Sequence, residues 1–215
     1  MKLKLEIFIV AISTIVLLNI GRSFGQPPTC AISPTPNCTG NFFPFPSPPE
    51  NHDFTFDTFS KYVNGITYNG ATTIKVVVNE IVAGTCRWRL HLMADHNAGA
   101  VNEWELVTPY GAAGSTPDVD ILEVRIRNAC NTSLTGNGFV PMQDKGLEID
   151  IITNENLDPN ADAGDCGTNV NGPGSYLTNY GEYSFIIDYR IVPGMNNLRP
   201  GNYTLTLRYC LTEDN

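Results

Sequence analysis

Residues 202–211 read NYTLTLRYCL, and apolar side chains occupy every second position of this stretch. The apolar positions are Tyr203, Leu205, Leu207, Tyr209 and Leu211. A side-chain period of two is the period of a β-strand with one buried face. The pattern therefore predicts a long, half-buried strand. The same alternation in residues 183–192, YSFIIDYRIV, predicts a second strand just before it.

Shorter runs of strand-like sequence, separated by Gly, Asn and Pro, fill much of the chain before these two strands. They lie at 54–59, 73–82, 86–94, 104–107, 119–127 and 147–153. About eight short strands with turn residues between them are typical of an antiparallel sandwich. We therefore predict an all-β fold, an antiparallel immunoglobulin-like β-sandwich over residues 52–215. Pro-Gly pairs at both ends of the loop 193–201 favour a long hairpin between the last two strands.

Prolines are concentrated in residues 26–51, which contain eight of the 15 prolines in the chain. Proline has no backbone N–H and a fixed φ, so it disfavours helices and central strands and favours an extended conformation. We therefore interpret residues 26–51 as an extended N-terminal arm. Phe42, Phe43 and Phe45 in this arm are expected to pack on the domain or on a partner.

Residues 1–25 have the three parts of a secretory signal peptide. Two lysines precede an apolar run from residue 7 to about residue 20, and the small residues Ser23 and Gly25 follow. We predict cleavage between Gly25 and Gln26. The alternative, a membrane anchor, is disfavoured because the run is shorter than the roughly 20 apolar residues that cross a bilayer. The sequence thus predicts a protein that is secreted, periplasmic or at the cell surface, and that meets a membrane only through its export signal.

The chain is acidic, with a formal net charge of −9 at pH 7. Residues 1–25 carry three basic side chains and one acidic side chain, so their removal makes the charge more negative. An acidic surface repels the phosphate backbone, which argues against nucleic acid as a partner. The same charge is compatible with the binding of cations.

Six cysteines lie beyond residue 25, and an even number in an exported chain indicates disulfides. A zinc site is the alternative, but the sequence lacks the closely spaced cysteine pairs that such sites use. Spacing alone cannot choose the pairing. Our working hypothesis is Cys30–Cys38, Cys86–Cys130 and Cys166–Cys210.

The best local candidate for a binding site is the polar stretch 154–165. Asp158, Asn160 and Asp162 alternate as in the first half of a calcium loop, where oxygen ligands come from one tightly turning segment. The pattern is incomplete, because Ala163 stands where such loops have glycine. We favour the alternative, a polar loop rich in Asx-turns. We therefore expect no cofactor, and calcium at this loop is the one candidate.

Trp104, flanked by Glu103 and Glu105, is the better of the two tryptophans for an exposed side chain that stacks on a sugar. Trp88 shares the apolar face of its predicted strand and is expected in the core. A polysaccharide is therefore one of the partners that the sequence suggests.

Enzyme motifs such as G-x-S-x-G, H-E-x-x-H and a Gly-rich phosphate loop do not occur in the sequence. The histidines, which are expected at the surface, are His52, His91 and His96. Asp118 with Asp120, and Glu148 with Asp150, are carboxylate pairs of the kind that glycosidases use. Each pair shares one face of a predicted strand, so solvent-facing charge is the simpler interpretation, and we predict that the protein is not an enzyme.

The end of the chain resembles a known signature. Residues 183–194 end in Val-Pro-Gly, and residues 198–209 read LRPGNYTLTLRY. This combination is similar to the C-terminal signature of pilin-like secreted proteins of the spore-coat-U and chaperone–usher type. The stretch FDTFSKYVNG at 56–65 resembles the opening of exported β-sandwich proteins of Bacteroidota-type bacteria. The pilin resemblance implies a sandwich that assembles into surface fibres, but the prolines of residues 26–51 depart from the donor strand of such subunits.

These expectations rank three functions. The first is a secreted structural or adhesive cell-surface protein, including a pilin-like subunit that associates with itself or with other surface proteins. The alternative is a non-catalytic module that binds carbohydrate or protein. The second alternative is a secreted hydrolase.

Overall fold

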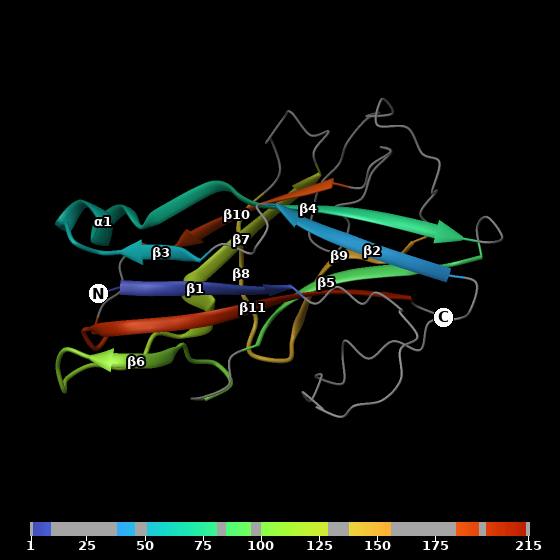
Figure 1. Cartoon of the computed structure of the whole chain (residues 1–215). Helices are drawn as coiled ribbons and strands as arrows, with labels where there is room; N and C mark the ends of the chain where they lie inside the picture. Colours follow the sequence, from blue (N-terminus) through green and yellow to red (C-terminus); the bar gives the residue numbers. More distant parts are fainter. Residues whose placement is uncertain are drawn as a thin grey trace.

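The computed structural model describes residues 2–9, 38–45, 51–80, 85–95, 100–128, 138–155, 184–193 and 197–213. Within these ranges the chain forms two β-sheets that enclose an apolar core (Figure 1). The prediction of an all-β sandwich is confirmed.

The first sheet has the strand order β3 (His52–Thr55), β1 (Lys2–Ile9), β11 (Gly201–Glu213), β5 (Trp88–Ala94) and β9 (Glu148–Glu155), and β6 (Glu105–Pro109) also pairs with β11. The second sheet has the order β2 (Cys38–Phe45), β4 (Ile66–Glu80), β10 (Ser184–Ile191), β7 (Leu122–Asn128) and β8 (Val140–Pro141). A short α-helix, α1 (Phe59–Asn64), and a 3-10 helix, Val119–Ile121, lie in connecting segments. Strand pairs are antiparallel, except that β1 and β11 run parallel.

The apolar faces of β10 and β11 meet across the core. Their buried residues are Phe185, Ile187, Tyr189 and Ile191 of β10, and Tyr203, Leu205, Leu207 and Tyr209 of β11. These are the residues that the alternation in the sequence places on one face of each strand. Trp88, at the start of β5, is also buried, as predicted.

The predicted hairpin between β10 and β11 is wrong. β10 pairs with β4 and β7 in the second sheet, whereas β11 pairs with β1, β5 and β6 in the first. The hydroxyl oxygens of Tyr189 and Tyr209 lie 2.6 Å apart between the sheets. Neighbouring strands of one hairpin present their apolar residues to the same side, so they cannot cover each other in this way. β10 and β11 therefore belong to different sheets and face each other across the core.

Part of the predicted N-terminal arm belongs to the sandwich. β2 pairs with β4 and lies at the end of the second sheet, so the domain begins before the predicted boundary at residue 52. Pro44 lies within β2. A proline is tolerated there because an edge strand has one side whose N–H groups need no partner strand.

The predicted strand at 54–59 is shorter than expected, because α1 begins at Phe59. Thr58 precedes this helix, and its Oγ1 accepts a hydrogen bond from the backbone N–H of Lys61 at 3.4 Å. Gly65 ends the helix with a φ of 72°, and a Cβ at this position would lie 2.3 Å from the carbonyl oxygen of Ile191. Glycine is therefore required at this turn. In the described part of the chain, no helix is long and apolar enough to cross a membrane.

A buried carboxylate joins three strands of the second sheet. Asp188 of β10 is fully buried, and its Oδ2 accepts a hydrogen bond from Nε of Arg125 at 2.7 Å. Its Oδ1 accepts hydrogen bonds from Arg127 at 3.2 Å and from the backbone N–H of Gly70 at 2.5 Å. Burial alone would raise the pKa of Asp188, but these donors outweigh it and hold the pKa below its ordinary value. The charge is therefore paired within the sheet.

Candidate functional site

β11 has partners on both of its edges. On one side β6 pairs with residues 201–204 and β5 pairs with residues 207–213. On the other side β1 pairs with residues 202–209 (Figure 1). The last strand is therefore central in its sheet, and its second edge depends on residues near the N-terminus of the chain.

Residues 2–9 lie between β3 and β11. We call this place in the first sheet the β1 position. The apolar residues of β1 and the buried residues of β11 are in register. The pairs are Leu3 with Tyr203, Leu5 with Leu205, Ile7 with Leu207 and Ile9 with Tyr209. β1 also pairs antiparallel with β3, where Leu5 is opposite His52. The β1 position therefore accepts a strand that can pair through its backbone on both sides and that has apolar residues at alternate positions.

The β1 position overlaps the segment that the sequence predicts to be removed. Residues 2–9 lie inside the predicted signal peptide, and cleavage after Gly25 stays a prediction. In a chain cut there, residues 202–209 of β11 and β3 lose the strand between them. An open edge of this kind presents a row of unpaired N–H and C=O groups and pairs readily with another chain.

Polar side chains lie in the core close to the β1 position. The Tyr189 hydroxyl contacts the Tyr209 hydroxyl and donates to Oγ1 of Thr72 at 3.3 Å. The ring of His52, on β3, lies 5.5 Å from the ring of Tyr189. Burial raises the pKa of Tyr189 to about 12, and it raises the pKa of Tyr209 as well. The two hydroxyls therefore stay protonated and link the sheets through a hydrogen bond.

This tyrosine pair predicts a loss of stability at alkaline pH. The folded protein holds the two protons more tightly than the unfolded chain, in which tyrosine has a pKa of about 10. The contribution is complete below about pH 10 and disappears as the pH rises toward about 12. Melting temperatures measured from pH 9 to pH 12 should fall less steeply for Tyr209→Phe than for the unsubstituted chain. Tyr110→Phe, at an exposed position, should behave like the unsubstituted chain; equal slopes for all three would contradict the assignment.

A second group of charged side chains lies on the face of the first sheet that points away from the core. Arg89 donates from Nε to Oδ1 of Asp150 at 2.8 Å, and its Nη2 lies 2.6 Å from Oε2 of Glu148. His91 lies beside them, with Nε2 3.4 Å from Oε1 of Glu148. Its side chain is 0% exposed, and burial is the main cause that lowers the pKa of His91. Glu148 and Asp150 are thus not free solvent-facing charges, since both are paired with Arg89.

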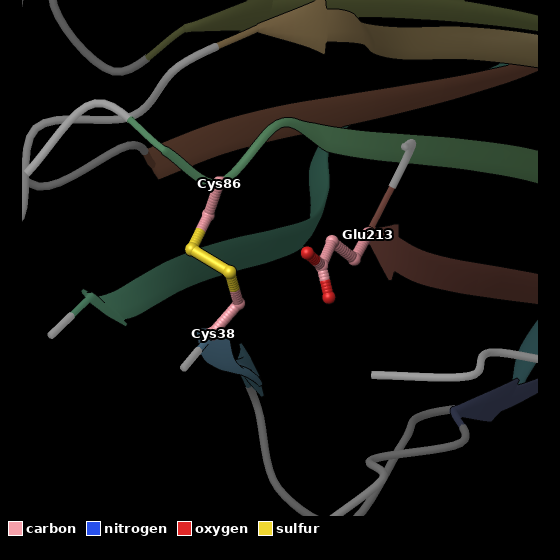
Figure 2. A group of neighbouring side chains, drawn as sticks. All are labelled: Cys38, Cys86 and Glu213. Atoms are coloured by element: carbon pink, nitrogen blue, oxygen red, sulfur yellow. A yellow bond between two sulfur atoms is a disulfide. The ribbon is translucent and has the colours of Figure 1, made fainter. Parts of the chain in front are cut away.

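A disulfide joins the beginning of β2 to the segment before β5. Figure 2 shows the bond between Cys38 and Cys86, whose Cα atoms are 5.9 Å apart, with the carboxylate of Glu213 close to it. The predicted pairs Cys30–Cys38 and Cys86–Cys130 are therefore wrong, because the sheets bring Cys38 beside a cysteine that is distant in sequence. The bond ties the first residue of β2, in the second sheet, to the segment that leads into β5 of the first sheet. Cys210 is also in a disulfide.

Removal of the Cys38–Cys86 bond should destabilise the fold. The bond closes a loop with a sequence separation of 48, and loss of a disulfide of this kind costs about 2–5 kcal/mol. Urea denaturation of Cys38→Ser should show this loss. Cys86→Ser should show the same loss, and the double substitution should add little, because both variants break one bond. Independent, additive losses would mean that the two cysteines do not pair.

Of the other residues that the sequence singles out as candidates, several lie outside the described residues and one is buried. Asp158, Asn160 and Asp162 lie outside the described residues, and so do Cys30, Cys130, Cys166 and His96. Trp104 is 0% exposed, so its expected exposure is wrong. Its side chain joins the core next to β6, although its two neighbours in sequence are glutamates.

The expected surface positions of His52 and His91 are also wrong, since both side chains are buried. Asp118 and Asp120 are exposed, as the interpretation of solvent-facing charge requires. They lie at and within the 3-10 helix, not on a strand.

Comparisons of the chain with known protein families and with curated proteins find no match. The resemblance to pilin-like proteins stays a prediction, and a function has to be argued from the geometry of the chain itself.

Proposed function

We propose that this chain is an exported structural subunit of the cell surface. Once residues 1–25 are removed, its β1 position accepts a strand of a neighbouring subunit. The observation that carries the proposal is that a central place in the first sheet is filled by a segment with the sequence of a signal peptide. If export removes residues 1–25, the first sheet has a strand between β3 and β11 only when another strand replaces β1.

The cost of leaving the β1 position open supports assembly. Tyr203, Leu205, Leu207 and Tyr209 are at most 1% exposed when β1 is in place. Burial of one large apolar side chain is worth about 1.5–3 kcal/mol, and each unpaired backbone group adds to the cost if water is excluded. A chain cut after Gly25 lowers its free energy by taking up a strand that covers this edge.

The register of β1 defines the chemistry of the incoming strand. It needs apolar residues at alternate positions over roughly the eight residues that pair with β11. A proline-dense segment cannot donate the ladder hydrogen bonds, so residues 26–37 of a neighbour are a poor source. The strand therefore comes from a part of the neighbouring chain that is free of prolines.

The test compares two forms of the protein, the full chain and the chain that begins at Gln26. N-terminal sequencing of the exported protein first establishes the cut. Light scattering after size exclusion should then show a monomer for the full chain and oligomers for the cut chain. Electron microscopy of expressing cells should show fibres or a surface layer.

A peptide provides the matched control for this assembly. A peptide of residues 2–9 with a soluble tag should bind the cut chain and convert oligomers to monomers. A peptide of the same composition, with the order changed so that the alternation is lost, should have no effect. A cut chain that is a monomer and ignores both peptides would overturn the proposal.

A further inference from the structure

We propose that His91, Glu148 and Asp150 form a binding site for a divalent transition-metal ion such as Zn²⁺, and that Arg89 occupies the site as an exchangeable cation. The site lies on the outer face of the first sheet, on β5 and β9. It is separate from the β1 position and does not depend on the proposed assembly.

The strand register brings the three ligands together. β5 and β9 are antiparallel neighbours, with His91 opposite Asp150 and Met93 opposite Glu148. Leu90 and Leu92 of β5 point into the core, so His91 between them faces outward. The possible ligand atoms of His91, Glu148 and Asp150 all lie within 4.8 Å of one another. Rigid strands, not a loop, hold this arrangement.

The distance between the first two ligands already matches a metal site. Two ligand atoms at about 2.1 Å from a tetrahedral Zn²⁺ lie about 3.4 Å apart. The distance from Nε2 of His91 to Oε1 of Glu148 is 3.4 Å. The carboxylate of Asp150 lies within 4.8 Å of both of these atoms, and its side chain is 26% exposed, so it can approach an ion once Arg89 releases it.

The ion pairs of Arg89 with Glu148 and Asp150 do not explain why His91 is buried beside them. Its side chain is fully buried, and among the residues that the structure describes neither Nδ1 nor Nε2 has a hydrogen-bond partner. Buried polar atoms without partners are rare in folded proteins. Arg89 pairs with the carboxylates of Glu148 and Asp150. It does not contribute a partner to His91, although Nε2 of His91 lies 3.4 Å from Oε1 of Glu148. A metal ion would satisfy that nitrogen.

Arg89 explains how the site can be stable with and without metal. Its guanidinium contacts Oε2 of Glu148 at 2.6 Å and Oδ1 of Asp150 at 2.7 Å, so it neutralises charge that a metal would otherwise balance. Oε1 of Glu148 faces His91 and is not the oxygen that Arg89 holds. Because the Arg89 side chain is 31% exposed, it can turn toward water when a divalent ion enters.

The ligand set selects the class of metal. One imidazole nitrogen with two carboxylates suits Zn²⁺ and similar ions, whereas Ca²⁺ and Mg²⁺ prefer oxygen ligands alone. Three protein ligands also leave at least one position for water or for a group from another molecule.

The test is isothermal titration of the untagged, chelator-treated full chain with ZnCl₂, together with the absorption spectrum of Co²⁺ as a substitute. We expect one Zn²⁺ per chain and visible Co²⁺ bands of the intensity that a four- or five-coordinate site gives. Glu148→Gln and Asp150→Asn should each weaken Zn²⁺ binding at least tenfold. Arg89→Gln should strengthen it, since the competing cation is gone. His91→Gln should abolish the Co²⁺ bands.

Glu123→Gln is the matched control, because Glu123 pairs with Arg190 on the second sheet with no histidine in the pair. It should bind Zn²⁺ as the unsubstituted chain does. If a substitution impairs folding, the rise in melting temperature on adding Zn²⁺ replaces the titration for that variant. Absence of Zn²⁺ binding, equal weakening in Glu123→Gln, or weaker binding in Arg89→Gln would each overturn the proposal.

Discussion

Asp188→Ala is expected to lower the free energy of unfolding by about 3–5 kcal/mol, the typical cost of removing one partner from a buried ion pair. The substitution leaves Arg125 and Arg127, whose side chains are only 14% and 16% exposed, without their shared carboxylate. It also leaves the backbone N–H of Gly70 without its acceptor. Urea denaturation measures the loss directly.

Two companion variants separate charge from packing at Asp188. Asp188→Asn keeps the shape and one acceptor oxygen, so its loss should be smaller than that of Asp188→Ala but still large. Asp120→Ala, at an exposed position, should change stability little. If Asp188→Ala were as stable as the unsubstituted chain, the ion pairs would not hold the second sheet together.

The same carboxylate sets a pH dependence. The pKa of Asp188 is lower in the folded protein than in the unfolded chain. Its contribution to stability is therefore complete above the unfolded pKa of about 4 and is lost as the pH falls through the folded pKa. Melting temperatures from pH 7 to pH 2 should fall more steeply for the unsubstituted chain than for Asp188→Asn. Parallel curves would contradict this assignment.

Leu205→Ala is expected to cost about 2–5 kcal/mol in the full chain, the range for large-to-small substitutions in a packed core. Leu205 is 0% exposed and lies in the middle of β11, in register with Leu5 of β1. Thermal and urea unfolding should both show the loss. Leu147→Ala is the control, because Leu147 is 53% exposed and its loss should be within about 0.5 kcal/mol. Similar small effects for both would mean that the face of β11 is not buried.

The buried faces of the strands could be predicted because alternation is a local property of the chain. In residues 185–191 and 203–211 every second residue is apolar, and each of those residues is in the core. Alternation says which side of a strand is buried but not which strand is its neighbour. For this reason the prediction that β10 and β11 pair in a hairpin is wrong.

The candidate sites depended on contacts that the sequence does not contain. The glutamate neighbours of Trp104 predict a surface position, but Trp104 lies just before β6 and is buried, because a side chain in extended backbone can face away from its two neighbours. His91 lies on the face opposite the core, and its burial could not be read from the sequence. The ion pairs of Asp188 have a signal in the sequence. Asp188 is the one carboxylate between the apolar residues of its predicted strand, and Arg125 and Arg127 lie two residues apart on another. The structure pairs them.

The most direct test of the β1 position is hydrogen–deuterium exchange in the chain that begins at Gln26, measured at concentrations where it is monomeric. The amides of residues 202–209 should exchange fast in this chain alone and become protected when the peptide of residues 2–9 is added. Residues 66–76 of β4, in the second sheet, should be protected in both samples. Equal and strong protection of residues 202–209 without the peptide would contradict the account, because it would show that this edge of β11 is already covered.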